Sequence, residues 1–326
     1  MEPLLPSENC TDVMEFAKLE MGIIFLIQTG VGILGNSSLL CFYTFALLTG
    51  NKRRPTDLIL NQLVLANSLI LYSKGIPQTM AAFGTEHFLH AASCKLLFYC
   101  HRVASGVSFT TSCLLNGFQA IKLDPSISGW MELKTRSPKF VGLCCFLCWI
   151  PHLLINTLIF RIVKGPLQLT NCSSMKNYAY CSWLMPERNA ILNTLMYYST
   201  DFMCLIFMVW ASGSMVLVLY RHKHRVQHIH RNSLSPRPSH EAKAIRTILI
   251  LVSLFFSFYS ISTTFVVWLT LVGNPGQWRV NSSVLVASCF ASFSPFVLLG
   301  SDRRISQCCY ACFKKETVFC NLVAVL

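Results

Sequence analysis

Apolar residues in this sequence gather in seven long runs that short polar segments separate. In lipid, only helices and closed barrels satisfy their backbone hydrogen-bonding groups, and about 20 apolar residues span a bilayer as a helix. The runs lack the alternation of apolar and polar residues that marks a barrel strand. The pattern therefore predicts an all-α membrane protein with a seven-transmembrane helix bundle. The expected spans are Met21–Leu48, Leu58–Phe83, Leu96–Ile121, Phe140–Phe160, Ala190–Tyr220, Thr247–Gly273 and Val284–Gly300.

Lysine and arginine are unevenly distributed between the loops that join these spans. The chain has a net charge of +13, and 18 of its 27 basic residues fall in the segments 52–54, 122–139, 221–246 and 303–315. By the positive-inside rule, the loops that carry this charge are cytoplasmic. We therefore expect the N-terminus outside and the C-terminus in the cytoplasm. Binding to nucleic acid is not expected, because no soluble domain carries the basic residues.

Composition and chain organisation indicate a single domain. Of the 326 residues, 53% are hydrophobic and only 13% are charged, which is too apolar for a soluble domain of this length. We expect one membrane domain over residues 1–326, with an extracellular N-terminal segment at 1–20 and a cytoplasmic tail at 301–326. Residues 1–17 contain four acidic residues and lack the regions of a signal peptide, so the first span is expected to direct insertion.

Sequons for asparagine glycosylation agree with this orientation. Asn9, Asn171 and Asn281 each begin an Asn-x-Ser/Thr triplet on the expected outer face. Asn36 begins a fourth triplet, but it lies inside the first span, where no glycan is expected. Such triplets also occur by chance. Their common placement nevertheless predicts glycosylation at the three outer positions.

Most of the 16 cysteines lie within the predicted spans, where a thiol behaves as a small apolar group. Cys94 lies at the outer start of the third span, and a disulfide to Cys181 would hold the second outer loop over the bundle. Cys172 in the same loop is the competing partner, although its place inside a sequon counts against it. We predict the Cys94–Cys181 pairing and keep Cys172 as the alternative.

Other cysteines and histidines on the cytoplasmic side resemble modification or metal sites. Cys308, Cys309 and Cys312 follow the last span in a basic segment, which suits S-palmitoylation, and unmodified thiols are the alternative. They lack a fourth ligand at the spacing that zinc requires. His224 and His228 stand one helical turn apart, but no carboxylate is near them. We therefore predict no metal site.

Ionisable residues inside a span cost free energy and often mark a functional site. Lys74, Arg102 and Asp201 are such residues, and at 1.5 Å per residue Arg102 lies roughly 12 Å below Cys94. All three fall in the outer half of the predicted bundle. One interpretation is that His101, Arg102 and Asp201 line an outward-facing pocket and contact a ligand. The alternative is that Lys74 reaches the membrane interface and Arg102 pairs with Asp201 as a structural lock.

Several classes of membrane protein need residues that this chain lacks. The motifs HExxH and GxSxG and a phosphate-binding glycine loop are missing, so we expect neither an enzyme nor a cofactor. A transporter usually shows repeat symmetry and charge near the midplane, and neither is found. The last span has no lysine for a Schiff base with a light-absorbing group. An outer pocket above a basic cytoplasmic face indicates a receptor.

The third inner loop and its flanks carry the longest recognisable motif. The stretch 210–237 begins Trp-Ala-Ser-Gly-Ser-Met-Val and continues through Val-Gln-His-Ile-His at 226–230. It resembles the signature of vomeronasal type 1 receptors, and the similarity extends over nearly the whole chain. Further similar segments are Gly75–Gly84, Thr110–Leu115, Phe118–Ile121, Tyr180–Ser182 and Ser294–Leu298.

Departures from the larger rhodopsin-like class point to the same family. Gln119 stands where that class places the arginine of its Asp-Arg-Tyr motif, so this ionic lock cannot form. Asn67 replaces the acidic residue that usually binds sodium, and Leu298 replaces the tyrosine of Asn-Pro-x-x-Tyr. The vomeronasal family shares these departures. Ala291 stands where the family has proline, which leaves Pro295 to bend the seventh span.

The resemblance implies a multi-pass G-protein-coupled receptor of the plasma membrane. Its expected partners are membrane lipid, a small volatile or pheromone-like ligand and an inhibitory-type heterotrimeric G protein. Ligand binding is expected to favour a conformation whose fifth and sixth spans separate on the inner side. The alternatives are a bitter-type taste receptor, an orphan receptor and a small-solute transporter.

Further site residues follow from this assignment. Tyr259 belongs to an aromatic cluster in the sixth span and joins His101, Arg102 and Asp201 as a candidate ligand contact, with core packing as its alternative. For the basic residues of the inner face, a role in topology alone is the alternative to partner binding. The candidate contacts with the G protein are Gln119, Arg221, Lys223, Arg225, Lys243 and Arg246.

Overall fold

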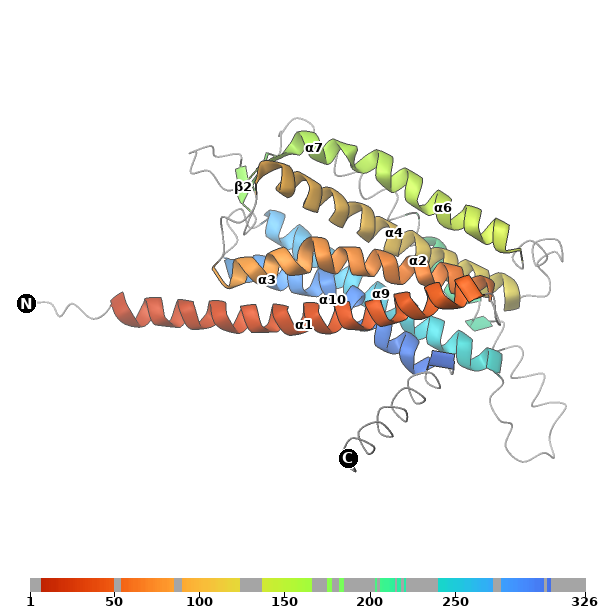
Figure 1. Ribbon diagram of the computed structural model, residues 1–326. Helices are drawn as coiled ribbons and strands as arrows, with labels where there is room; N and C mark the ends of the chain where they lie inside the picture. Colours follow the sequence, from red (N-terminus) through yellow and green to blue (C-terminus); the bar gives the residue numbers. More distant parts are fainter. Residues whose placement is uncertain are drawn as a thin grey trace, which may run out of the picture.

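The computed structural model shows long helices that run side by side as a bundle (Figure 1). The helices are α1 (Ser7–Thr49), α2 (Pro55–Ile70), the π-helix η1 (Leu71–Gly75), α3 (Ile76–Ala82), α4 (Ala91–Leu123), α6 (Pro138–Ile155), the 3-10 helix η2 (Asn156–Leu158), α7 (Ile159–Ile162), α9 (His240–Leu271) and α10 (Gln277–Ser301). Residues 206–214 are also helical. The structure describes residues 7–49, 54–84, 90–123, 137–165, 175–177, 182–184, 203, 206–214, 216–217, 220, 240–271, 277–301 and 304–305.

The helices contain the apolar runs but extend beyond them. α1, α4 and α10 include the whole of the predicted spans Met21–Leu48, Leu96–Ile121 and Val284–Gly300. Each begins earlier than its apolar run, because hydropathy detects residues suited to lipid, whereas polar helix formers continue the same backbone hydrogen bonding. Much of the N-terminal segment at 1–20 is therefore helical, since α1 starts at Ser7.

A π-helical turn interrupts the second long helix just before Pro77. Pro77 lacks a backbone N–H and crowds the carbonyl of the preceding turn, so the regular ladder cannot continue through it. η1 absorbs this change, and α2, η1 and α3 follow one another without a break. At Gly75 the chain approaches α1 so closely that an added Cβ would lie 2.7 Å from the Thr29 hydroxyl oxygen. The irregularity before Pro77 thus takes the form of a π turn packed against α1.

A small antiparallel sheet follows α7, in the segment for which the sequence predicted an outer loop. Its strands are β1 (Val163–Gly165), β2 (Met175–Asn177) and β3 (Ser182–Leu184), in the order β1-β3-β2. Gly165 pairs with Ser182, and Lys176 pairs with Trp183. Strands this short show no readable periodicity in a sequence. β1 also packs against α4, so the sheet lies at the end of the bundle where α4 begins.

We call the end of the bundle at Cys94 and the sheet the outer end, and the end at Asp57 the inner end, after the predicted topology. α2 packs between α1 and α4, α6 contacts both α4 and α2, and α10 contacts both α1 and α9 (Figure 1). The main core joins all of these helices through buried apolar side chains. Its members include Leu39, Tyr43, Ile59, Leu63, Phe109, Leu115, Val141, Leu251, Phe290 and Leu298.

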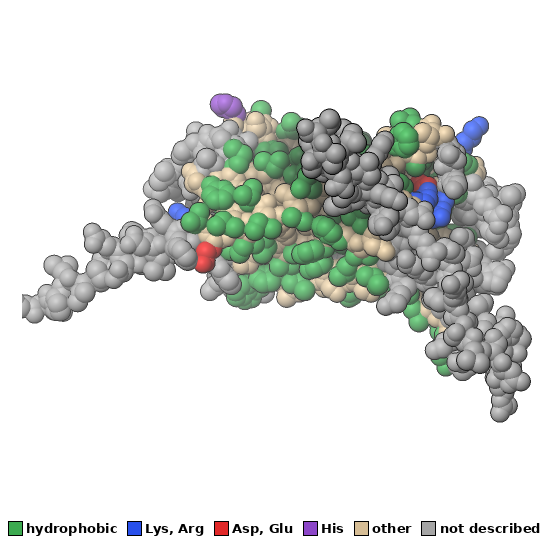
Figure 2. Space-filling view, turned by 60° about the horizontal axis from the view of Figure 1, so that its bottom comes forward, with side chains coloured by type: hydrophobic (Ala, Val, Ile, Leu, Met, Phe, Trp, Pro, Cys, Tyr) green, Lys and Arg blue, Asp and Glu red, His purple; other side chains and the backbone are tan. Residues whose placement is uncertain are grey.

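Large apolar side chains also cover the outside of the bundle. Leu48 is 81% exposed, Leu34 71% and Phe45 68%. In the space-filling view, apolar side chains form a broad band, and the charged groups in sight lie toward its two ends (Figure 2). An exposed apolar surface of this size is suited to lipid rather than to water. Within the described part of the chain, Lys18–Thr49, Pro138–Ile155 and Asn281–Gly300 are helical stretches long and apolar enough to cross a membrane.

Candidate functional site

Four basic side chains from three elements meet in the outer half of the bundle. Lys74 lies on η1, His101 and Arg102 on α4, and His152 on α6. Arg102 is close enough to interact electrostatically with each of the other three, and Lys74 also interacts with His101. We call these four residues the basic cluster. Sequence reasoning placed His101 and Arg102 in an outer pocket, and the structure brings Lys74 and His152 to the same place.

His152 was not predicted, and its environment is unusual for an ionisable residue. It is only 5% exposed, and its Nε2 atom has no hydrogen-bond partner among the described residues. Its ring packs onto Gly106 of α4 so closely that a Cβ at Gly106 would overlap it. The signal in the sequence was the pairing of a histidine with Pro151 inside a span. Buried polar atoms without partners are rare and point to a functional or solvated site.

The basic cluster has a second unsatisfied atom at His101. Nδ1 of His101 is buried without a hydrogen-bond partner among the residues that the structure describes. A ligand group or a water molecule that donates or accepts hydrogen bonds could satisfy both histidines. The cluster can therefore contact a polar or anionic group within an otherwise apolar bundle.

Tyr259 lies on α9 and stacks on Phe109 of α4. The ring centroids are 5.3 Å apart and the planes differ by 18°. Phe109 is seven residues along α4 from Arg102, which corresponds to a rise of about 10 Å. The stacking supports a packing role for one face of Tyr259, which packs against the main core about two turns below Arg102.

A glycosylated asparagine usually lies in an exposed loop, whereas Asn281 lies in a helix. It belongs to the second turn of α10, and its Oδ1 accepts a hydrogen bond of 3.0 Å from Nε2 of Gln78 on α3. Gln78 is 2% exposed, so the contact ties the two helices together at the outer end. A glycan is bulky and needs an accessible asparagine. Glycosylation at Asn281 stays a prediction, and the contact with Gln78 counts against it.

Cys94 is disulfide-bonded, whereas the other cysteines with described side chains are free thiols. Its partner therefore lies outside those residues, where both Cys181 and Cys172 fall. Cys181 immediately precedes β3, and β3 pairs with β1, which packs against α4. This arrangement brings the chain next to Cys181 toward the helix that carries Cys94.

A buried polar network crosses the middle of the bundle at Asn67. Its Oδ1 accepts a hydrogen bond of 2.7 Å from the Ser108 hydroxyl, and its Nδ2 donates to the Ser294 oxygen at 2.9 Å. Asn67 is fully buried and joins α2, α4 and α10. Rhodopsin-like receptors carry a sodium-binding acidic residue at this position. Here the residue is a neutral amide whose oxygen and nitrogen both form hydrogen bonds.

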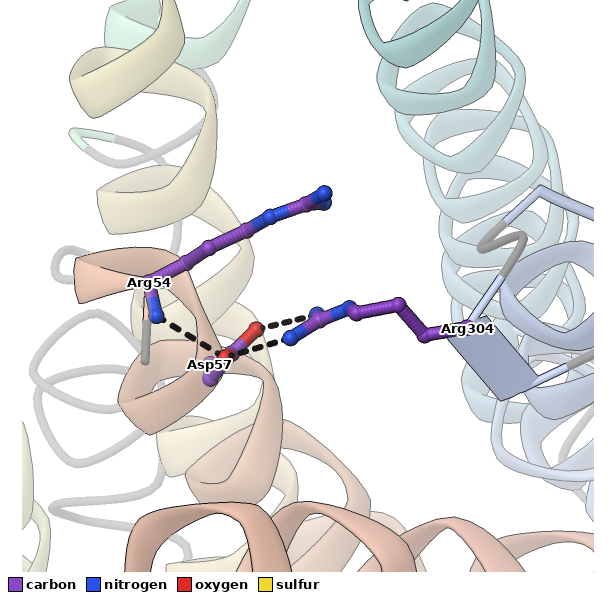
Figure 3. Close-up of polar contacts among 3 residues, drawn as sticks. All are labelled: Arg54, Asp57 and Arg304. Atoms are coloured by element: carbon purple, nitrogen blue, oxygen red, sulfur yellow. Dashed lines mark hydrogen bonds and ion pairs between the residues drawn. The ribbon is translucent and has the colours of Figure 1, made fainter. Parts of the chain in front are cut away.

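At the inner end, Asp57 and Arg304 form an ion pair that sequence reasoning did not single out (Figure 3). Nη2 of Arg304 lies 2.7 Å from Oδ1 of Asp57, and Nη1 lies 3.0 Å from Oδ2. The backbone N–H of Arg54 donates to the same carboxylate at 3.0 Å. The signal in the sequence was Arg-Pro-x-Asp at the start of α2, a typical N-terminal capping pattern.

Several predicted site residues lie where the structure does not describe them. Gln119 is described, and it is half-buried near the inner end of α4. Asn9, Lys243 and Arg246 lie on described helices, but their side chains are not described. The remaining candidates outside the described residues are Asn171, Asp201, Arg221, Lys223, Arg225, Cys308, Cys309 and Cys312.

The bundle as a whole matches a known receptor fold. Superposition on squid rhodopsin gives a TM-score of 0.71 over 98% of this chain and 89% of that chain, although the sequences are only 14% identical. The chain therefore has the fold of rhodopsin.

Sequence comparison defines the family within that class. Residues 19–311 match the model of the vomeronasal organ pheromone receptor family. The chain is 60% identical over 314 residues to vomeronasal type-1 receptor 1 of gorilla and of human, which covers 96% of this chain and 89% of either relative. It is also 29% identical over 286 residues to zebrafish olfactory receptor class A-like protein 1, which covers 87% of this chain and 90% of that relative. This chain belongs to the vomeronasal organ pheromone receptor family, as its motifs predicted, and it is a chemosensory G-protein-coupled receptor.

Proposed function

We propose that this receptor binds a small volatile or pheromone-like molecule at its outer end and signals through an inhibitory-type G protein. The observation that carries the proposal is the basic cluster, in which two buried histidine nitrogens have no hydrogen-bond partner among the described residues of an apolar bundle. Small ligands bind mainly through apolar contacts, with few polar groups that fix their orientation. The cluster supplies such polar groups.

The proposed topology is seven spans in the plasma membrane, with the N-terminus outside and the tail in the cytoplasm. The concentration of basic residues in alternate loops supports this orientation. The proposed outer disulfide joins Cys94 to Cys181. Glycans are proposed at Asn9 and Asn171, and palmitoyl groups at Cys308, Cys309 and Cys312.

His101, Arg102 and Tyr259 are the proposed ligand contacts among described residues, and Lys74 and His152 join them through the basic cluster. Asp201 is proposed to face the same pocket. The alternative for Arg102 is a structural ion pair with Asp201. In either case Arg102 is the central charge of the cluster, because its positive charge acts on all three other members.

At the inner end, the G protein is proposed to contact Gln119 together with the basic residues Arg221, Lys223, Arg225, Lys243 and Arg246. Ligand binding favours the conformation that exposes this surface, and the G protein binds that conformation more tightly. The half-buried position of Gln119 near the end of α4 supports its share in such a surface.

Ligand-stimulated guanine-nucleotide exchange tests this function directly. The full receptor, with surface expression confirmed, is assayed in membranes with an inhibitory-type G protein against a panel of volatiles and steroids. A dose-dependent response that Arg102→Gln abolishes and the exposed-site control Lys18→Gln retains is the expected result. Nucleotide exchange that no compound stimulates, with stimulatory and inhibitory G proteins alike, contradicts the proposal.

A further inference from the structure

We infer that Asp57 and Arg304 are a positioning pair for coupling: their ion pair holds the inner end of α10 against α2 and keeps the receptor in its resting conformation. This inference rests on the proposed coupling to a G protein. Asp57 and Arg304 are 247 positions apart in the sequence, so the contact reflects the folded bundle alone. The two residues join the start of one span to the segment that follows the last one.

The geometry of the pair favours a single, well-defined arrangement. Both carboxylate oxygens of Asp57 are engaged by the guanidinium of Arg304, at 2.7 and 3.0 Å. Two parallel hydrogen bonds between a guanidinium and a carboxylate fix the relative orientation of the two groups as well as their distance. The Asp57 side chain is 1% exposed and that of Arg304 is 20% exposed. The ion pair is therefore largely shielded from water, so salt screens it much less than it screens an exposed pair.

Asp57 is held in place by its own helix, independently of Arg304. Pro55 starts α2, the backbone N–H of Arg54 donates to Oδ2 of Asp57, and the backbone N–H of Asp57 donates to the Arg54 carbonyl oxygen. The carboxylate also lies in the first turn, where the helix dipole favours negative charge. Asp57 is thus the fixed half of the pair, and Arg304 is the half that can leave with α10.

Arg304 is bound on its other side as well. Its guanidinium carbon lies 5.9 Å from the centre of the Phe42 ring on α1, within the range of a cation–π contact. The next residue, Ile305, is 3% exposed and packs in the main core. Arg304 and Ile305 therefore rest on α1, α2 and the main core. In the proposed switch, the ion pair breaks when the inner end of α10 moves.

The location of the pair connects it to coupling. α4 ends and α9 begins at the same end of the bundle, and these helices carry Gln119, Lys243 and Arg246 (Figure 1). Gln119 cannot form the ionic lock that the arginine of Asp-Arg-Tyr forms in other receptors. A buried pair between α2 and the end of α10 supplies an alternative restraint on the inner ends of the helices. A bundle that can pack in two ways, one with this ion pair and one without it, can act as a conformational switch.

The test uses the full receptor in lipid nanodiscs with an inhibitory-type G protein and no ligand. Arg304→Gln removes the pair but leaves the cap of α2 intact, and Arg304→Lys retains the charge. Arg54→Gln is the matched control, because its side chain extends away from the carboxylate while its backbone still caps α2 (Figure 3). Asp57→Asn removes the charge from the other side.

Basal nucleotide exchange and hydrogen–deuterium exchange of residues 297–305 are measured in parallel. We expect Arg304→Gln and Asp57→Asn each to raise basal nucleotide exchange about threefold or more, and the double variant to show no further rise. Arg304→Lys is expected to recover amide exchange and coupling only in part, because its ammonium group keeps the charge but cannot bind both carboxylate oxygens in the same way. Arg54→Gln is expected to match the wild type in both measurements.

Each other outcome has a definite meaning. If Arg304→Gln leaves amide exchange unchanged, the pair does not hold α10 and the inference is wrong. If amide exchange rises while basal coupling stays level or falls in a receptor that couples, the pair is a structural contact only. If the wild type fails to couple to any G protein, the proposed function is overturned together with the coupling role, and amide exchange still decides whether the pair holds α10.

Discussion

Gly106 shows how a single residue sets the geometry of the basic cluster. Its lack of a side chain lets the His152 ring lie directly on α4, where a Cβ would overlap the ring. His152 in turn interacts with Arg102, four residues before Gly106 on the same helix. A small residue at this position is therefore a requirement of the site rather than of helix formation, for which glycine is a poor choice.

We expect Gly106→Ala to lower the free energy of unfolding by about 1–3 kcal/mol, the usual cost of overpacking a core. Thermal unfolding of the purified receptor measures the effect. Gly30→Ala is the matched control, because nothing lies within 4 Å of a Cβ at that helical position. The control is expected to be neutral or stabilising, and equal losses in both variants would contradict the role assigned to Gly106.

Asn67 provides a second prediction at the scale of one residue. Its amide engages Ser108 and Ser294 and offers no negative charge to a cation. The thermal stability of the wild type is therefore expected to be the same in sodium chloride and in choline chloride.

The variant Asn67→Asp places a carboxylate at the same buried position. We expect it to destabilise the receptor by about 1–3 kcal/mol in choline chloride, because a buried charge without a partner loses its hydration. Sodium is expected to recover part of this loss. If sodium raises the thermal stability of the wild type, Asn67 does not exclude the ion.

At the scale of elements, hydropathy located the helices well and their irregularities poorly. A proline inside an apolar run disturbs a helix, but only the structure shows that a π turn at Leu71–Gly75 absorbs the disturbance at Pro77. The sheet was missed because each strand has three residues, too few for periodicity to appear. The start of α1 at Ser7 was also missed, since polar helix formers carry no hydropathy signal.

The sheet and the outer disulfide are expected to act together on the second outer loop. Peptide mapping without reduction is expected to recover a peptide linked through Cys94 and Cys181. Cys94→Ser and Cys181→Ser are each expected to cost about 2–5 kcal/mol of stability and to reduce surface expression. Cys172→Ser serves as the control and is expected to behave like the wild type. A linked peptide that contains Cys172 would assign the disulfide to the alternative partner.

At the scale of the whole molecule, the packing of α10 against α3 changes the expected pattern of glycosylation. We expect Asn9→Gln and Asn171→Gln each to increase electrophoretic mobility and Asn281→Gln to leave it unchanged, because Asn281 is packed against Gln78. Treatment with a glycosidase is the control and is expected to remove the differences. A mobility shift that depends on Asn281 would mean that the outer end of α10 separates from α3 in the membrane.

The amino-acid sequence by itself determined the class of protein, the approximate positions of the helices and the family. These properties follow from local patterns, since hydropathy and short motifs can be read from consecutive residues. Two candidate ligand contacts, His101 and Arg102, were predicted in the same way, because charge inside an apolar run is conspicuous.

Only the tertiary structure decided which residues meet. His152 joins the basic cluster, Gln78 holds Asn281, and Asp57 binds Arg304 across 247 positions of sequence. No local pattern encodes such contacts, because each partner is an ordinary residue of its own helix. The relative rotation and depth of the packed helices bring them together, and these depend on side-chain packing throughout the core.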